Sequence, residues 1–286
     1  LLLDKGAEVD RATKNGATPL LIACQQGHDG AVRLLLDNGA EVDRARENGE
    51  TPLHIACQKG RVEVALLLLD KGADVDQADE EGMTPLYIAC RNGQVDAARL
   101  LLDRGADVDR ANKNGTTPLF VVCWKGHVDA AGLLLDKGAD VDRARKNGQT
   151  PLYIACAEGH VDVARLLLDK GAEVDRAAED GQTPLWTACC NGHVDAARLL
   201  LEKGADVNRT NKDGYTPLFA ACHEDHVDAV LLLLDKCAVD RAVSRGWKKG
   251  QTPLFIACEN GHVDAVQLLL DKGAEVDRAV SKVDRA

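Results

Sequence analysis

The chain has 286 residues, of which 45% are apolar and 28% charged, the balance of a folded protein and not of a disordered one. Aromatic residues make up only 3%, so the core must consist of thin layers of Leu, Ala, Val, Ile and Cys. A formal net charge of -11 repels phosphate backbones and argues against nucleic acid as a partner. Apolar stretches such as residues 65–69 are far too short to span a bilayer, so we expect no direct membrane insertion.

The tripeptide Thr-Pro-Leu recurs through the chain with a fixed period. Seven copies lie 33 residues apart and an eighth follows after 36, with threonines at Thr18, Thr51, Thr84, Thr117, Thr150, Thr183, Thr216 and Thr252. All 8 prolines of the chain lie in these tripeptides, and a glycine stands two residues before each threonine. A fixed period of this length is the signature of a solenoid built from repeated supersecondary units.

Each repeat is predicted to contain two helices followed by an extended finger. In the fifth repeat Thr150 suits the N-cap, and Pro151 suits the first helical position because it lacks only an N–H that would be orphaned there. An amphipathic second helix over 160–171 ends at Gly171, a residue that tolerates the left-handed C′ position. The finger over 172–181 leads to the next repeat. Because no unit can bury its apolar stripe alone, neighbouring units must stack into one core.

The runs Gly-x-Thr-Pro-Leu-x-x-Ala-Cys-x-x-Gly-His and Leu-Leu-Leu-Asp-Lys-Gly-Ala-Asp-Val-Asp resemble the ankyrin repeat over essentially the whole chain. The resemblance implies an all-α repeat solenoid, a curved stack of antiparallel helix pairs with β-hairpin fingers at right angles. We expect a single ankyrin-repeat domain over 1–286, with eight full repeats over 13–279. Residues 1–12 are interpreted as the tail of a preceding repeat, and 280–286 as the start of a further repeat or finger.

The two ends predict that the chain is a piece of a longer array. It begins at Leu1, its only methionine is Met83, and neither terminal repeat has the polar outer face that caps a complete solenoid. This interpretation keeps a second class of function open beside a protein-binding scaffold. The chain is then the regulatory ankyrin arm of a larger enzyme or membrane channel.

Eight of the ten cysteines share one position inside the first helix: Cys24, Cys57, Cys90, Cys123, Cys156, Cys189, Cys222 and Cys258. Units stacked about 10 Å apart hold these thiols too far from one another for disulfides or shared zinc ligation, so we expect small, buried core residues. So many unpaired thiols indicate a reducing, intracellular and cytoplasmic location. Cys190, on the predicted concave face, and Cys237, in place of a helix-ending glycine, are candidates for reactive thiols beside the plainer reading as inert ones.

Six histidines occupy one slot at the start of the second helix, where we expect them to satisfy helix ends: His28, His127, His160, His193, His226 and His262. His223 and His226 have the i, i+3 spacing of many metal-ligand pairs, but no third ligand is evident, so neither a metal nor a cofactor is predicted. The sequence contains no nucleophile–base–orienter set and no phosphate-binding glycine loop. We therefore predict that the chain is not an enzyme.

In ankyrin repeats, partners contact the finger tips and the exposed side of the first helices, which together line a concave groove. Tryptophan at such an exposed position is typical of a binding hot spot, whereas most polar residues there are simply solvated. The candidate partner-binding residues are Arg91, Trp124, Lys125, Tyr215, His223 and Trp247. The sequence thus favours a monomeric, non-catalytic scaffold for protein–protein interaction.

Two further rows of side chains repeat along the array. Aromatic residues follow Thr-Pro-Leu directly where the family most often has histidine: Tyr87, Phe120, Tyr153, Trp186, Phe219 and Phe255. Only His54 keeps the histidine, so we expect stacking between units to replace its hydrogen bonds, with a partly exposed binding surface as the alternative. Arginines at the base of the fingers are interpreted as a charge-balancing ladder, with a grip on an acidic partner as the alternative: Arg11, Arg44, Arg110, Arg143, Arg176 and Arg209.

Two irregularities interrupt the pattern. Residues 243–249 lengthen one finger and add Trp247, so this junction should be the least regular part of the array. Asp29 and Gly30 replace the Val-Asp of most units and place a carboxylate where the second helix is expected to bury an apolar side chain. We therefore expect the first full repeat to be looser than the others.

Overall fold

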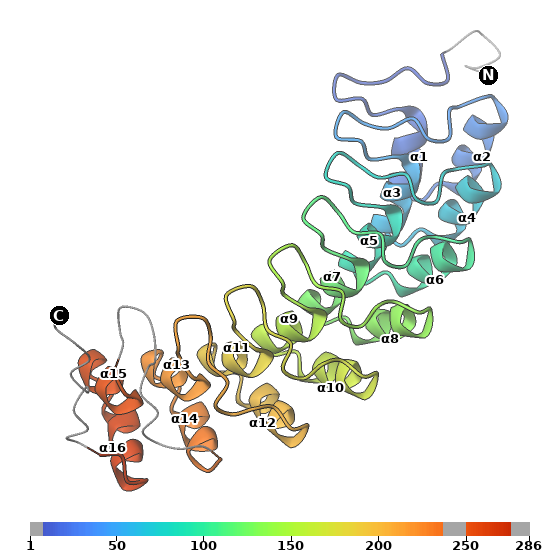
Figure 1. The fold of residues 1–286 in the computed structure, drawn as a ribbon. Helices are drawn as coiled ribbons and strands as arrows, with labels where there is room; N and C mark the ends of the chain where they lie inside the picture. The colour runs from blue at the N-terminus through green and yellow to red at the C-terminus, as the bar shows by residue number, and fades with distance from the viewer. Residues whose placement is uncertain (1–7, 237–249, 276–286) are drawn as a thin grey trace, which may run out of the picture. The chain divides into compact units, whose positions relative to one another are not determined.

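The computed structural model describes residues 8–236 and 250–275, and within these residues it contains sixteen α-helices and no β-strand (Figure 1). The chain divides into two compact units, Leu1–Lys146 and Asn147–Ala286, called here the N-terminal and the C-terminal unit. None of the helices in the described ranges is long and apolar enough to cross a membrane.

The N-terminal unit consists of four helix pairs that stack on one another in chain order (Figure 1). Its helices are α1 (Pro19–Gln26), α2 (Asp29–Asp37), α3 (Pro52–Gln58), α4 (Val62–Asp70), α5 (Pro85–Arg91), α6 (Val95–Asp103), α7 (Pro118–Lys125) and α8 (Val128–Asp136). First helices pack on first helices and second helices on second helices, so the unit has two helical layers. The repeated two-helix architecture predicted from the sequence is confirmed.

The C-terminal unit repeats the same arrangement. Its helices are α9 (Pro151–Ala157), α10 (Val161–Asp169), α11 (Pro184–Cys190), α12 (Val194–Glu202), α13 (Pro217–His223), α14 (Val227–Leu234), α15 (Pro253–Asn260) and α16 (Val263–Asp271). Although residues 237–249 lie outside the description, α15 packs on α13 and α16 on α14, as in the preceding repeats.

Every first helix begins in the way that the tripeptide predicts. The threonine is the N-cap in extended conformation, and proline occupies the first turn. The threonine hydroxyl accepts a hydrogen bond from the backbone N–H three residues on, as Thr117 Oγ1 does from Phe120 N at 3.1 Å. This cap supplies an acceptor for one of the orphan donors of the helix start. The equivalent threonine caps α13, where Thr216 Oγ1 accepts a hydrogen bond from Phe219 N at 3.1 Å.

The core is a layer of small apolar side chains in the first helices, closed by one face of the second helices. In α7 the residues from Pro118 to Cys123 are all buried, whereas α6 buries only Ala97, Ala98 and Leu101. Burial raises the pKa of the Cys24 thiol to about 12, and raises the pKa of Cys57, Cys90 and Cys156 still further, so these four thiols remain neutral and inert.

The expectation that all eight repeat cysteines are buried is wrong at Cys258, which is exposed while the other seven are buried. It belongs to α15, the last first helix of the described residues. No described helix packs on the side of α15 that faces away from α13, and Phe255 on the same helix is accordingly 46% exposed. Burial at this position therefore depends on a following repeat and not on the helix pair itself.

No strand occurs in the described ranges, so the β-hairpin fingers that the resemblance implies are not confirmed. In one finger Asp79 N donates to Met83 O at 3.0 Å and Gly82 N to Asp79 O at 2.9 Å, which closes a tight turn. Among the described residues, a single backbone–backbone bond, from Glu80 N to Asn48 O at 3.1 Å, joins this finger to the preceding one. A β-ladder needs a run of such bonds, so the fingers are linked turns and not strands.

The glycine that recurs two residues before each Thr-Pro-Leu threonine has a steric cause in these fingers. Gly82 has a φ of +79°, and a Cβ built on it would lie 3.0 Å from Lys113 N and 3.3 Å from Asn112 Cα of the next finger. A larger residue is therefore both strained in its backbone and too close to a neighbouring main chain.

Ion pairs join successive second helices at their C-terminal ends. Lys71 Nζ lies 2.7 Å from Asp37 Oδ1, and Lys203 Nζ lies 2.7 Å from Asp169 Oδ1. The lysine hydrogen bond lowers the pKa of Asp37 and of Asp169. The finger-base arginines also act locally, since Arg44 pairs with Glu41 at 3.5 Å, in line with the predicted charge-balancing ladder.

The first repeat buries less than its neighbours, but not for the predicted reason. Asp29 is exposed and starts α2, where a carboxylate is favourable at the positive end of the helix dipole. The equivalent valines are themselves partly exposed, Val128 to 38%, so Asp29 does not replace a buried side chain. Helix α2 nevertheless buries Val32 alone, whereas α4 buries Val64, Ala65, Leu67 and Leu68.

Candidate interaction surface

The last turn of each first helix is the place where the buried framework meets solvent. The two residues that lie seven and eight positions after the Thr-Pro-Leu threonine are half-buried or exposed in every repeat. This helix-end row is Gln25, Gln26, Gln58, Lys59, Arg91, Asn92, Trp124 and Lys125 in the N-terminal unit. In the C-terminal unit it is Ala157, Glu158, Cys190, Asn191, His223, Glu224, Glu259 and Asn260.

The helix-end row carries opposite charge in the two units. The basic residues of the N-terminal row are Lys59, Arg91 and Lys125, and the acidic residues of the C-terminal row are Glu158, Glu224 and Glu259. Among the sixteen residues of the row, aspartate and glutamate are absent from the N-terminal part, and lysine and arginine from the C-terminal part. Two similar backbones therefore present surfaces of different electrostatic sign.

Trp124 and Lys125 end α7 on this surface. Trp124 is 43% exposed, as the sequence predicted, and Lys125 Nζ lies 4.4 Å from the centroid of its ring. A cation over an indole face at this distance is a favourable cation–π contact, which orients the ring and adds charge beside it. Arg91 lies at the end of α5, half-buried, with Nη1 3.5 Å from Met83 Sδ of its own repeat.

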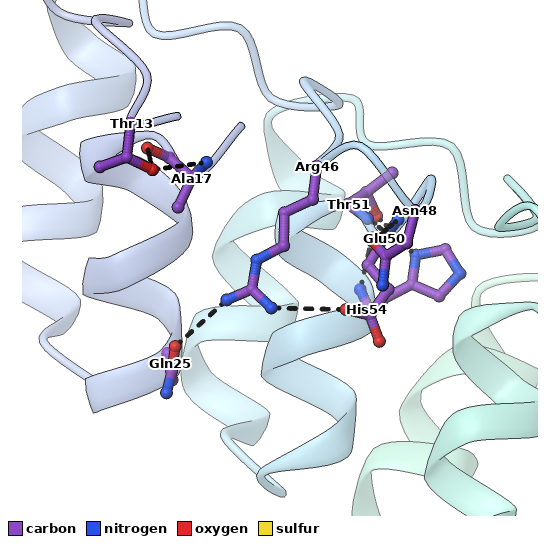
Figure 2. A network of polar contacts seen from close by, with 8 residues as sticks. All are labelled: Thr13, Ala17, Gln25, Arg46, Asn48, Glu50, Thr51 and His54. Atoms are coloured by element: carbon purple, nitrogen blue, oxygen red, sulfur yellow. Dashed lines mark hydrogen bonds and ion pairs between the residues drawn. The ribbon is translucent and has the colours of Figure 1, made fainter. Parts of the chain in front are cut away.

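Two arginines from the finger turns lie over the first helices of the N-terminal unit. Arg46 donates to Gln25 Oε1 at 3.3 Å and to Glu50 Oε2 at 3.4 Å, and so reaches back onto α1 (Figure 2). Arg145 holds the same repeat position, and its guanidinium Cζ lies 5.1 Å from the ring centroid of Phe120. Neither arginine is among the residues predicted from the sequence, although both stand five residues before Thr-Pro-Leu, a shared position that the repeat pattern makes visible.

The C-terminal unit has a pocket of about 240 Å³ between α11, α13 and the finger that joins their repeats. Its lining residues are Trp186, Cys190, Asp213, Tyr215, Phe219, Ala220, His223 and Glu224. The rings of Tyr215 and Phe219 stack with centroids 4.8 Å apart and an interplanar angle of 6°. The pocket therefore combines aromatic walls with two carboxylates, and it brings together the predicted residues Tyr215 and His223.

Hydrogen bonds to the finger fix the shape of this pocket, which we call the aromatic–acidic pocket. Trp186 Nε1 donates to Tyr215 O at 3.1 Å, which ties α11 to the finger of the next repeat. Asn211 Oδ1 accepts from Asp213 N at 3.0 Å and from Tyr215 N at 2.9 Å. Because both finger residues of the lining are held by their backbone, the pocket is largely pre-formed.

Burial and nearby carboxylates keep the titratable hydroxyl and thiol of the pocket neutral. Burial, followed by the Glu224 charge, raises the pKa of Cys190 to about 11, and burial followed by Asp213 raises the pKa of Tyr215. Cys190 is thus a poor nucleophile, which favours the hypothesis of an inert thiol over that of a reactive one. His223 Nδ1 lies 2.7 Å from Glu224 Oε1, so this imidazole is paired along the rim.

The histidines of the Gly-His slot do not cap their own helices, because His127, His193 and His262 make no side-chain cap bond there. They lie instead on the preceding repeat. His262 Nε2 is 3.1 Å from the carbonyl of His223, the last residue of α13. A Cβ built on Gly159 would lie 2.6 Å from His193 Nδ1, which explains the glycine of the preceding repeat.

The aromatic ladder is mainly packing, with two exceptions. Tyr87, Phe120, Tyr153 and Phe219 are buried, Trp186 is half-buried and Phe255 is 46% exposed. The expectation that loss of histidine removes its hydrogen bonds is wrong at Trp186. His54 Nε2 contacts Met83 O at 2.9 Å, and Trp186 Nε1 makes the equivalent bond to Tyr215 O.

No group of three His, Cys, Asp or Glu side chains suited to a metal ion occurs in residues 8–236 and 250–275. Trp247, Cys237 and the insertion 243–249 lie outside the described residues. The candidate residues Arg91, Trp124 and Lys125 belong to the N-terminal unit, while Tyr215 and His223 belong to the C-terminal unit.

A family model described as ankyrin repeats (3 copies) matches residues 1–79, 75–145, 141–211 and 206–279. The chain therefore belongs to the ankyrin-repeat family. Ankyrin repeats are generally protein-interaction modules and are typically not catalytic. No curated protein matches the chain.

Proposed function

We propose that the chain is a non-catalytic scaffold that binds a protein partner through the helix-end row and the finger tips, the concave-groove residues of an ankyrin repeat. The observation that carries this proposal is the contrast within each first helix. Its body buries the leucine of Thr-Pro-Leu in every repeat, whereas its last turn exposes a different pair of side chains in every repeat. A fold that holds its core constant and varies its exposed positions is suited to recognition.

Trp124 is the strongest candidate anchor on this surface. Large aromatic side chains lose little conformational entropy on binding and dominate the energetics of protein interfaces. Lys125, over its ring, adds a positive charge that suits an acidic group on the partner. In the C-terminal unit the candidate anchor is Tyr215, a finger residue whose ring stacks on the ring of Phe219.

The location follows from the thiols. Cys24, Cys57, Cys90 and Cys156 are buried, free thiols, and we infer a reducing, cytoplasmic compartment from them. The partner must then be another protein of that compartment, bound by a single copy of the chain.

Affinity capture with the 286-residue chain as bait, followed by quantitative mass spectrometry, tests the scaffold proposal. We expect the double variant Trp124→Ala/Tyr215→Ala to lose about thirtyfold or more in affinity for the captured partner, since hot-spot truncations cost about 2 kcal/mol or more. The matched control is Leu66→Ala/Leu231→Ala, which shortens side chains that are 38% and 43% exposed on second helices, one in each unit.

Circular dichroism must show the same helix content for both double variants. Equal capture by the wild type and the Trp124/Tyr215 variant removes these residues as anchors. Failure of the wild-type chain to retain any protein above the level of bare resin contradicts the scaffold function itself.

A further inference from the structure

We propose that the aromatic–acidic pocket of the C-terminal unit receives an arginine side chain of the protein partner. The inference deepens the proposed scaffold function and rests on it, because the arginine is supplied by the partner. It assigns a ligand chemistry to Trp186, Tyr215 and Glu224 that the scaffold proposal does not specify.

The N-terminal unit contains an internal precedent for such a contact. Phe120 holds the same repeat position as Trp186 and Phe219, and the Arg145 guanidinium of the next finger lies over its ring at 5.1 Å. Arg46 reaches over the first repeat in the same way and hydrogen-bonds Gln25, the repeat equivalent of Cys190 (Figure 2). The space above the first helix, beside the next finger, thus accommodates a guanidinium in this fold.

At the aromatic–acidic pocket the finger supplies Asn211 in place of that arginine. Asparagine is much shorter, and its Oδ1 is used by the backbone N–H groups of Asp213 and Tyr215 in its own turn. Correspondingly, Trp186 is half-buried where Phe120 is 1% exposed. The site that an arginine of the chain fills in the fourth repeat is therefore open to an arginine from outside in the sixth.

The charges of the pocket suit the same ligand. Asp213 and Glu224 both line it, and among its described lining residues lysine and arginine are absent. Cys190 and Tyr215 are neutral, so they do not oppose a cation, and His223 is directed to Glu224. The nearest basic neighbour in the finger, Lys212, has an exposed side chain.

Arginine fits these walls better than lysine for a geometric reason. Its planar guanidinium stacks on aromatic faces and binds carboxylates through a fork of donors, whereas the lysine ammonium is a strongly hydrated point charge. The volume of about 240 Å³ is suited to one side chain and not to a larger ligand.

The test uses the whole chain and the peptide acetyl-Gly-Arg-Gly-amide, with the indole N–H resonance of Trp186 as the readout in nitrogen-15 NMR. A Trp186→Phe variant assigns that resonance. We expect the arginine peptide to shift it with a dissociation constant in the millimolar range, as is usual for a single side chain. The citrulline peptide, which has the same shape without the charge, should bind about tenfold more weakly, and the lysine peptide should lie between the two.

Three substitutions examine the pocket from the protein side. Asp213→Asn and Glu224→Gln should each lower the affinity for the arginine peptide by about threefold, because each removes one negative charge from the pocket. Asn211→Arg should place an internal guanidinium in the pocket, as Arg145 does at Phe120, and abolish peptide binding. The matched control, Ala178→Arg, introduces the same side chain one finger earlier and should leave peptide binding at Trp186 unchanged.

Equal binding of the arginine and citrulline peptides, tighter binding of the lysine peptide, or no shift of the Trp186 resonance overturns the proposal. If Asn211→Arg does not fold, the two carboxylate variants decide in its place, and unchanged affinity in both contradicts the pocket. A negative peptide result with intact capture of a partner that needs Trp124 leaves the scaffold function standing, so the two failures are distinguishable.

Discussion

The two units are built from the same repeat, yet they differ in the charge of their exposed positions and in which side chains occupy the space above their first helices. The N-terminal helix-end row carries Lys59, Arg91 and Lys125, and the space above its first helices holds Arg46 and Arg145 of the chain itself. The C-terminal row carries Glu158, Glu224 and Glu259, and of these Glu224 lines the aromatic–acidic pocket. Because the framework is common to both, the two surfaces differ through only a few exposed positions per repeat.

The largest expected effect tests whether the framework is equivalent in the two units. Leu101 and Leu200 hold the same position in α6 and α12, and both are fully buried. We expect Leu101→Ala and Leu200→Ala each to lower the free energy of unfolding by about 2–5 kcal/mol, through lost burial and the cavity left behind. Chemical denaturation followed by circular dichroism measures both. A loss in one unit only, with no change in the other, breaks the equivalence.

A smaller effect concerns the charges of the two rows. Charge reversal in either row should lower the affinity for the captured partner by about tenfold at low salt. The N-terminal variant is Lys59→Glu, Arg91→Glu and Lys125→Glu, and the C-terminal variant is Glu158→Lys, Glu224→Lys and Glu259→Lys. Calorimetry at low and high salt should show that added salt reduces both differences. If both reversals leave affinity unchanged, the charge contrast has no part in recognition.

The smallest expected effect is a pH dependence confined to the N-terminal unit. Burial lowers the pKa of His54, whose ring nitrogens contact Thr51 and Met83 O, while the equivalent Trp186 does not titrate. The unfolded chain therefore takes up a proton near the ordinary histidine pKa of about 6.5, at which His54 stays neutral in the folded state. Stability from His54 is full above that pH and declines as pH falls toward the lowered pKa.

The variant His54→Tyr carries the residue that Tyr87 and Tyr153 hold in other repeats, and it should remove this component. The free energy of unfolding of the wild type and of the variant is measured at about pH 5.5 and about pH 7.5. These values lie about one unit below and above the ordinary histidine pKa. The wild type should lose more stability on acidification than the variant, because the remaining histidines are common to both. Identical losses contradict the assignment.

The sequence was sufficient for the helices and for the exposure of single residues, because these depend on spacing within one repeat. Thr117 caps its helix and Trp124 is exposed as the pattern predicts. Contacts between repeats were harder to predict, because they depend on which side chain of the next finger lies over the first helix. The bond of Trp186 to Tyr215 O, the position of Arg145 over Phe120 and the place of His193 on Gly159 all cross that boundary.

Burial at the last described repeat could not be inferred from the pattern either. Cys258 and Phe255 have the same local sequence as their buried equivalents, yet both are exposed. Their environment is set by what packs on α15 and not by the residues of α15 itself. A periodic sequence predicts the interior of an array well and its margins poorly.

The central claim is that a partner binds on the helix-end row in both units. Trp124 belongs to that row in the N-terminal unit, and Trp186 lines the aromatic–acidic pocket together with the row residues Cys190, His223 and Glu224 of the C-terminal unit. A titration of the labelled chain with the captured partner, followed at the indole N–H resonances of both tryptophans, therefore tests binding in each unit. We expect both resonances to shift and to saturate together at one partner per chain. Formation of the complex with both resonances unmoved would contradict it.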